Sequence, residues 1–378
     1  MPRRAVANVL QTFHCVAMSR HLNPIASDTA RGRGAGSCDT GRFERHSRAA
    51  DHDGWDIPEE VRVLRTQVSE ERPRSVLNYV RSPDIPFDRT INPYRGCEHG
   101  CIYCFARPSH AYLNLSPGLD FETKLIARPE APAVLDRELR AKGYRPAPVA
   151  IGTNTDPYQP VERERGIMRA ILGVLRDFRH PVGIVTKGAM VERDADILSS
   201  MAAEGLARVG ISITTLDPVL ARRMEPRAPA PARRLAAIRR LTDAGIPVRL
   251  MVSPVVPALT DPEMEAILEA GAEAGADAAS WIMLRLPREV SPLWQDWLEA
   301  HYPDRAERVM NRLREMHGGK EYDSAWHRRM RGEGPYAEII GRRFAVAARR
   351  LGLDRKTPQL RTDLFAPPLR SGDQMSLF

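Results

Sequence analysis

The chain has 378 residues, of which 43% are hydrophobic and 28% are charged, a composition ordinary for a soluble globular protein. This composition excludes a fully disordered chain and a fibre, and the lack of any run of about 18 apolar residues excludes a membrane span. The net charge of +8 is unevenly placed, because residues 304–361 carry +7 whereas residues 55–303 carry −1.

The first 54 residues carry eight arginines and many glycines, with no regular hydrophobic period. This pattern predicts a disordered or mis-started N-terminal extension over residues 1–54. The first 27 residues contain no acidic residue, which is also a trait of organellar transit peptides, so a targeting segment is the alternative interpretation.

From about residue 85, apolar or β-branched runs alternate with amphipathic stretches. The predicted strands cover residues 148–155, 182–188, 207–215, 247–257 and 278–287, with a first strand near residues 90–96. The predicted helices cover residues 162–178, 194–205, 232–245 and 262–275, and three of them end in a glycine suited to a left-handed cap, Gly205, Gly245 and Gly275.

Strands separated by helices indicate βαβ units and a parallel sheet. About six units are too few for a closed eight-stranded barrel, so we expect an α/β fold with a partial (β/α)6 TIM-like barrel over residues 75–290. In such folds the functional residues gather at the C-terminal ends of the strands.

After Pro287 the strand pattern stops, and helices are predicted over residues 293–302, 304–317 and 336–353. Residues 291–357 are therefore expected to form a basic helical appendage, whose charge either faces a polyanion or forms a solvated helical surface. Residues 358–378 are predicted to be a flexible tail.

The cysteines predict a metal site. Cys97, Cys101 and Cys104 form a C-x3-C-x2-C motif, and no cysteine follows Cys104. Thiols clustered in eight residues of so long a chain do not indicate a disulfide framework, whereas at this spacing they can converge on one point, as metal ligands do. Zinc, completed by His99 or His110, and an iron–sulfur cluster with one open iron both remain possible from the spacing.

The C-x3-C-x-Tyr-C form of this motif, with Tyr103 before the last cysteine, resembles the radical S-adenosylmethionine (SAM) superfamily. Further strings resemble the branch that contains spore photoproduct lyases and their uncharacterised relatives, over residues 74 to 353. These strings are INPYRGCEHGCIYCFARPSH, IGTNTDPYQPVE, VTKG, GISITT, EPRAPAPARRLAAIRRLTDAGIP and LRLP.

The resemblance implies a radical SAM enzyme in which three cysteines hold a 4Fe–4S cluster and SAM chelates the fourth iron. Cleavage of SAM would give a 5′-deoxyadenosyl radical that abstracts hydrogen from a substrate, and a walled cavity would protect this radical. The cluster ligands would be Cys97, Cys101 and Cys104, and the cofactor-binding candidates are Tyr103, Gly152, Thr153, Asn154, Lys187, Ser212 and Thr214.

Each candidate has a stated role and a plainer alternative. Tyr103 would lie against the cluster and the adenine. Gly152, Thr153 and Asn154, with Asp156, would contact the methionine end of SAM, or they form an ordinary strand-to-helix turn. Lys187 would pair with the methionyl carboxylate, or it is an exposed loop lysine.

Ser212 and Thr214, two residues apart on one strand face, would bind the ribose, although threonine is common in strands. Glu225 and Arg233 match positions in the branch but are explained equally well as surface charges. Arg285 near the last strand would need an anion, such as a substrate phosphate.

One departure from the resembled branch concerns the final hydrogen donor. Spore photoproduct lyases are expected to use a further cysteine downstream of the cluster, and this chain has none after Cys104. Cys15 and Cys38 precede it, in the segment predicted to be disordered. We therefore expect this protein not to be a spore photoproduct lyase in the strict sense.

The last five residues, Gln374 to Phe378 (QMSLF), resemble the short peptide that docks into the bacterial sliding clamp. A frayed hydrophobic end is the alternative interpretation.

The function that we expect is a cytoplasmic radical SAM enzyme with lyase-like or repair-like chemistry on an unknown substrate. The expected partners are SAM, an electron donor such as flavodoxin or ferredoxin, DNA or another nucleic acid, and the sliding clamp, with no membrane. The alternative is a non-catalytic zinc or iron–sulfur protein that binds nucleic acid or the replication machinery.

Overall fold

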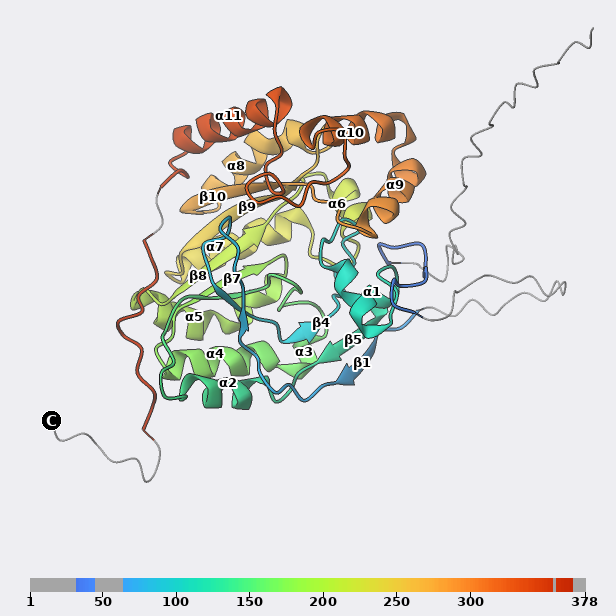
Figure 1. Cartoon of the computed structure of the whole chain (residues 1–378). Coiled ribbons are helices and arrows are strands. Elements are labelled where there is room, and N and C mark those ends of the chain that lie inside the picture. The colour runs from blue at the N-terminus through green and yellow to red at the C-terminus, as the bar shows by residue number, and fades with distance from the viewer. Residues whose placement is uncertain (1–31, 45–63, 356–357, 370–378) are drawn as a thin grey trace, which may run out of the picture.

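The computed structural model describes residues 32–44, 64–355 and 358–369 (Figure 1). Cys15 and the C-terminal peptide Gln374 to Phe378 lie outside the described residues. In the described part of the chain, no helix is both long enough and apolar enough to cross a membrane.

A mixed sheet of seven strands forms the centre of the molecule, in the order β10-β9-β8-β7-β6-β3-β2. Six strands are parallel: β3 (Arg89–Ile91), β6 (Val149–Ile151), β7 (Val182–Thr186), β8 (Ala207–Ser212), β9 (Val248–Val255) and β10 (Ala278–Met283). The short strand β2 (Asn78–Tyr79) is antiparallel to β3 and forms one edge, and β10 forms the other. The predicted six-unit open α/β architecture is therefore confirmed.

The strands form because alternate apolar side chains fill the core on one side of the sheet. Register places Ile151 beside Ile184 and Ile211 beside Leu250, and all four side chains are at most 1% exposed. This continuous buried row fixes the register, because a slip by one residue would reverse which side chains face the interior.

The outer face of the sheet is covered by a row of helices (Figure 1). These are α2 (Ala131–Leu139), α4 (Ile167–Asp177), α5 (Ala195–Ala203), α7 (Pro231–Asp243) and α8 (Met264–Glu273). The predicted single helix over residues 162–178 is wrong, because Gly166 has a φ of +63° and separates α3 (Glu162–Arg165) from α4. The caps at Gly205, Gly245 and Gly275 are confirmed by φ values of +74°, +76° and +97°.

A second sheet, which the sequence did not reveal, has the order β1-β5-β4. Its strands are β1 (Gln67–Glu70), β4 (Tyr94–Arg95) and β5 (Lys124–Ala127). Strands β4 and β5 pair antiparallel, so they close the base of the loop that carries the three cysteines. That loop contains the 3-10 helix η1 (Arg107–Leu113) and the short helix α1 (Asp120–Thr123).

The predicted helical appendage consists of α9 (Val290–His301), α10 (Pro303–Met316) and α11 (Pro335–Arg350), beside β10 (Figure 1). Ion pairs from Arg343 to Glu265 and from Arg350 to Glu269 attach α11 to α8. Part of the basic excess is therefore used inside the fold, which favours the interpretation as a structural helical surface over a free polyanion-binding face. The remaining short elements are η2 (Ala189–Asp194), α6 (Pro218–Met224) and η3 (Asp261–Glu263).

The two end segments are more ordered than their composition predicts. Residues 32–44, placed in the predicted disorder, pack against the cysteine loop, and Ala35 is 1% exposed. In the predicted flexible tail, Leu364 and Phe365 pack on the core, and the Ala366 amide donates to the carbonyl of Phe178 at 3.1 Å. Both expectations are therefore wrong for the described parts of these segments.

Candidate active site

The three cysteines lie on the loop between β4 and β5, and all three line one cavity at the C-terminal ends of the parallel strands. Gly96 and Gly100 have φ values of +77° and +67°, which lets the loop wind tightly. A Cβ atom on Gly96 would lie 2.8 Å from the carbonyl oxygen of Phe121. The loop therefore tolerates only glycine at this position.

A buried ion pair supports the loop from behind. Arg107, fully buried, donates to the carbonyl oxygens of Cys101 at 3.0 Å and Gly100 at 3.2 Å. Its charge is balanced by Glu122, also fully buried, with an Nη2–Oε1 distance of 2.5 Å. This pair could not be predicted from the sequence, because neither residue belongs to the cysteine motif.

The donor set fits an iron–sulfur cluster better than a zinc ion. Among the described residues, no three His, Cys, Asp or Glu side chains meet at the position of a single metal ion, so the expected convergence on one point is not observed. His99 lies 3.3 Å from Asp156, and His110 is hydrogen-bonded to the Lys124 carbonyl, so neither completes a Cys3His site. Three thiols that share a cavity without a common ion position suit ligands of three different irons.

Burial keeps the thiols of Cys97 and Cys101 protonated in the metal-free protein. It raises the pKa of Cys101 to about 12 and raises the pKa of Cys97 well above its ordinary value. Metal binding must therefore displace these protons, because the thiolate is the ligand.

Tyr103 lines the cavity, and its hydroxyl belongs to a buried hydrogen-bond network. The hydroxyl donates to Glu225, which pairs with Arg234, and both charged side chains are at most 2% exposed. Although burial raises the pKa of Glu225, the charge of Arg234 lowers it, and the net pKa is about 2. Glu225 is therefore an ionised part of the site and not a surface charge.

Gly152, Thr153 and Asn154 line the same cavity where β6 ends. Gly152 has a φ of +94°, and a Cβ there would lie 1.9 Å from the carbonyl oxygen of Val185. Three residues after Gly152, the hydroxyl of Thr155 donates to the carbonyl oxygen of Gly96 at 2.6 Å. The turn is thus both a cavity wall and a direct support of the cysteine loop.

Asp156 orders the adjoining wall. Its carboxylate accepts hydrogen bonds from the Thr186 hydroxyl at 2.6 Å and from the Lys187 amide at 2.8 Å. Burial raises the pKa of Asp156, but His99 and these hydrogen bonds lower it to a net value of about 2. Asp156 therefore orients the end of β7, and its oxygens are already occupied by protein donors.

Two of the three remaining candidates lie on the cavity wall. Lys187 directly follows β7 and places its ammonium group 5.7 Å from the centre of the Tyr103 ring. No carboxylate of the described residues lies within ion-pairing distance of Lys187. Ser212 ends β8 and lines the cavity, whereas Thr214 lies behind it and donates to Glu225 at 2.8 Å.

The last two candidates from the sequence, Arg285 and Arg233, lie in different parts of the molecule. Arg285, two residues beyond β10, lines the cavity. Arg233 lies on the surface, where it pairs with Glu192, and takes no part in the site.

The sequence matches the model of the radical SAM superfamily over residues 91–271. It is also 37% identical over 260 residues to an uncharacterised protein of Mycobacterium tuberculosis, an alignment that covers 68% of this chain and 75% of the relative. The chain belongs to the radical SAM superfamily. An uncharacterised protein of Methanocaldococcus jannaschii is 26% identical over 223 residues, which cover 59% of this chain and 79% of that protein.

The protein is therefore a radical SAM enzyme whose cofactors are a 4Fe–4S cluster and SAM. The three thiols on the cavity wall and the cation at Lys187 fit these groups.

Among solved structures, spore photoproduct lyase complexed with dinucleoside spore photoproduct has a similar fold. The TM-score is 0.55 and the identity is 14%, with 75% of this chain and 79% of that chain covered. At this identity the likeness concerns the fold.

Proposed function

We propose that this radical SAM enzyme abstracts a hydrogen atom from a nucleic-acid substrate in a lyase-like or repair-like reaction. The proposal rests on one arrangement above all: a single cavity holds three thiols, the unpaired cation of Lys187 and the unpaired cation of Arg285. Neither cation has a hydrogen-bond or ion-pair acceptor among the described residues, so the cavity provides for two anionic groups, one on SAM and one on the substrate. A nucleic acid supplies the second as a phosphate.

When bound, the cluster and SAM supply the reductive cleavage of the sulfonium C–S bond, which gives methionine and a 5′-deoxyadenosyl radical. The cluster would be held by Cys97, Cys101 and Cys104. Lys187 would pair with the methionyl carboxylate, and Ser212 would hydrogen-bond the ribose. Thr153 and Asn154 offer hydroxyl and amide groups to the amino-acid end.

Part of the cavity lining is apolar. Val185, Met251, Ile282, Met283 and Leu284 present hydrocarbon and thioether surface. Such a wall excludes water from a reactive carbon radical, so it limits side reactions during hydrogen abstraction.

Among the described residues, no cavity cysteine is free to serve as the hydrogen donor that restores the product. Apart from the three proposed cluster ligands, no cysteine of the described residues lines the cavity. Cys38 lies outside the cavity lining, with its sulfur 3.6 Å from an Asp120 carboxylate oxygen. This supports a reaction distinct from that of spore photoproduct lyase in the strict sense.

The decisive experiment is reductive cleavage of SAM by anaerobically reconstituted protein, with and without DNA, RNA or protein. We expect nucleic acid to stimulate the release of 5′-deoxyadenosine, and the Cys101→Ala variant to release none. Stimulation by protein alone would contradict the proposed substrate class. A colourless protein with stoichiometric zinc would instead favour a non-catalytic binding module.

The proposed setting is the cytoplasm, with flavodoxin or ferredoxin as the reductant. The proposed contact with the sliding clamp depends on the terminal peptide. Removal of Leu377 and Phe378 should abolish capture by purified clamp, and unchanged capture would contradict this contact.

A further inference from the structure

Arg285 and Phe105 form a stacked pair on the cavity wall. Arg285 follows β10, and Phe105 follows the last cysteine of the motif. The guanidinium carbon of Arg285 lies 3.9 Å from the centre of the Phe105 ring, which is a close cation–π stack. The stack fixes the direction of a long side chain that would otherwise have many rotamers.

The guanidinium of Arg285 has no acceptor. No hydrogen bond or ion pair joins it to another described residue, although burial is strong enough to lower its pKa. The nearby carboxylate of Asp84 is already taken by Arg329, through contacts of 2.6 and 2.8 Å. Arg285 is partly buried, and its donors are not taken up by the described residues, so an anion from outside is the natural partner.

Arg285 and Lys187 approach the cavity from different strands. Lys187 follows β7 and Arg285 follows β10, and β8 and β9 lie between them. At about 4.8 Å per strand, the two attachment points are separated by roughly 14 Å along the sheet. The second cation is therefore placed for an anionic group other than the one at Lys187.

We propose that Arg285 and Phe105 bind one nucleotide unit of the substrate, with Arg285 on the phosphate and the Arg285–Phe105 stack against the base. Phe105 is 43% exposed, so part of its ring is open to a ligand. Arginine suits both roles, because its planar fork binds phosphate oxygens and its face stacks on rings. This inference rests on the proposed function and names the chemistry of its substrate.

The test measures binding, independently of SAM cleavage. A fluorescent single-stranded oligodeoxynucleotide is titrated with wild type, Arg285→Met, Phe105→Leu and the matched control Arg288→Met, in which the arginine is exposed and lies outside this cavity. We expect Arg285→Met to weaken binding about tenfold, and Arg288→Met to have little effect. An oligonucleotide with uncharged methylphosphonate links keeps its bases but loses the phosphate charge. It should therefore narrow the difference between wild type and Arg285→Met, whereas Phe105→Leu should still bind it more weakly than wild type.

Two outcomes would overturn the inference. One is equal oligonucleotide binding by wild type and Arg285→Met. The other is weaker binding of SAM itself to cluster-loaded Arg285→Met, which would place this arginine in the SAM site. If SAM is cleaved normally but nucleic acid never binds through Arg285, only this inference fails. If SAM is not cleaved at all, the proposed function fails.

A second inference concerns residues 32–44, here called the strap, which run along the outside of the cysteine loop. Backbone contacts hold the two segments together at several points. A Cβ on Gly34 would lie 1.8 Å from the Gly100 carbonyl oxygen, and a Cβ on Gly118 would lie 2.3 Å from the Ser37 carbonyl oxygen. The Leu119 amide also donates to the Ser37 carbonyl at 3.0 Å.

The strap completes the buried ion pair behind the cysteines. The amides of Gly34 and Ala35 donate to the two carboxylate oxygens of Glu122, each at 2.9 Å. Glu122 in turn balances Arg107, which holds the carbonyl oxygens of Gly100 and Cys101. The strap is therefore connected to the backbone of the proposed cluster ligand Cys101 through Glu122 and Arg107.

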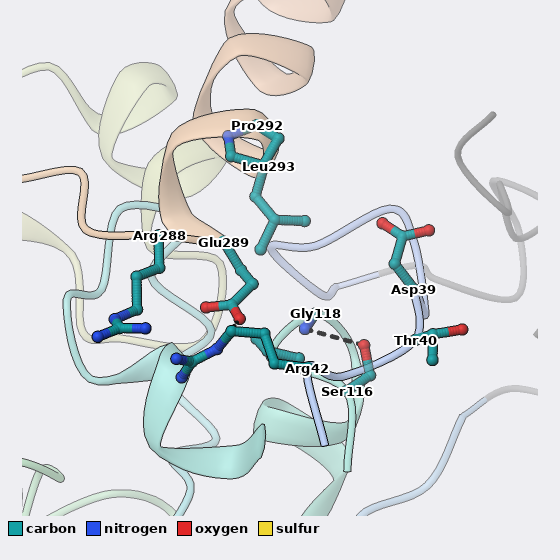
Figure 2. Close-up of a pocket in the computed structure, with 10 residues that line it drawn as sticks. Asp39, Thr40, Arg42, Ser116, Gly118, Arg288, Glu289, Pro292 and Leu293 are labelled. Carbon is teal, nitrogen blue, oxygen red and sulfur yellow. Dashed lines mark hydrogen bonds and ion pairs between the residues drawn. The ribbon is translucent and has the colours of Figure 1, made fainter. Parts of the chain in front are cut away.

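The other end of the strap is attached to the start of α9. Figure 2 shows Arg42 of the strap directed at Glu289, with which it forms an ion pair, beside the turn that contains Ser116 and Gly118. Arg42 also donates to the Pro108 carbonyl at 3.3 Å. The strap is thus fixed at both ends across the loop.

We infer that the strap is a positioning part of the iron–sulfur site. Gly34→Ala introduces a methyl group where the Gly100 carbonyl lies, whereas Gly36→Ala is a matched control with open space around the new Cβ. After anaerobic reconstitution, we expect Gly34→Ala to lose bound iron and to show an altered electron paramagnetic resonance spectrum and midpoint potential. Gly36→Ala should match wild type.

A purely structural role would lower the melting temperature of Gly34→Ala while leaving iron content, spectrum and potential unchanged, and that result would overturn the inference. If Gly34→Ala does not fold, Arg33→Met provides the same test. This change removes hydrogen bonds from Arg33 to the carbonyls of Glu122 and Leu64, without adding bulk to the close contact. A wild-type spectrum and potential in folded Arg33→Met would contradict a positioning role.

Discussion

Two groups of cations surround the cavity, and they differ in what neutralises them. Arg107 and Arg234 are almost completely buried, and each is paired with a buried glutamate, Glu122 or Glu225. Lys187 and Arg285 line the cavity itself, and neither has an acceptor among the described residues.

This difference separates cations that stabilise the protein backbone from cations that are available to bind a ligand. A paired, buried cation contributes to holding the backbone in place, and its removal leaves a charged partner uncompensated. A cation in the cavity without such a partner does not stabilise the ligand-free protein in this way. Its presence there therefore points to a bound ligand.

The largest expected effect on stability comes from removing one of the paired, buried cations. Arg107→Met should reduce the free energy of unfolding by about 3–5 kcal/mol, because it leaves the Glu122 charge buried without its partner. Denaturant unfolding of the metal-free protein measures this change. The control Arg342→Met breaks an exposed pair with Glu338 and should cost less than about 0.5 kcal/mol. Equal effects would remove the distinction between buried and exposed pairs.

The second effect is a pH dependence of the Glu225–Arg234 pair. The pKa of Glu225 is lowered from 4.5 to about 2, so the stabilisation is complete above pH 4.5 and is lost as the pH falls toward 2. In that range the wild-type free energy of unfolding should fall by up to about 1.4 kcal/mol per pH unit more than that of Glu225→Gln. Parallel pH profiles of the two proteins would refute an ionised Glu225.

The third effect concerns SAM binding by Lys187, one of the two cations that line the cavity. Lys187→Met should weaken SAM binding to the cluster-loaded protein by about tenfold or more, because it removes a charge-assisted contact to the carboxylate. Equilibrium binding with Lys320→Met as an exposed control measures the change. The unfolding free energy of the metal-free Lys187 variant should stay close to that of wild type, and a large loss would place Lys187 with the paired cations.

The smallest effect is the most diagnostic. Arg285→Met should leave the melting temperature of the metal-free protein unchanged or slightly raised, because it removes a desolvated charge without a protein acceptor. Calorimetry of this variant beside Arg107→Met compares the two groups of cations directly. If Arg285→Met lowered the melting temperature as much as Arg107→Met does, the proposed difference between the two groups of cations would be wrong.

The sequence predicted those parts of the site that depend on local pattern. The six βα units follow from the alternation of apolar runs and amphipathic stretches, and the metal site at the three cysteines follows from the spacing of their motif. Lys187 and Ser212 were candidates because of the resemblance, and both lie at strand ends that line the cavity. Thr214 was predicted to share a face with Ser212, but β8 ends at Ser212, so the two-residue alternation no longer holds and Thr214 lies behind the wall.

The parts that escaped prediction depend on contacts between distant residues. Glu225 looked like a surface charge because its partners, Tyr103 and Arg234, are recognised only in the folded chain. The glycines of residues 32–44 looked like disorder, yet Gly34 is required by a backbone contact with Gly100, 66 positions away. Composition reports a tendency toward disorder and contains no information on such close approaches.

The docked segment 358–369 covers the end of the sheet that lies opposite the cavity. Its backbone contacts are with Gly205 and Phe178, which precede β8 and β7. No residue of this segment lines the cavity, so the segment closes the far end of the sheet and leaves the mouth of the cavity open to the substrate.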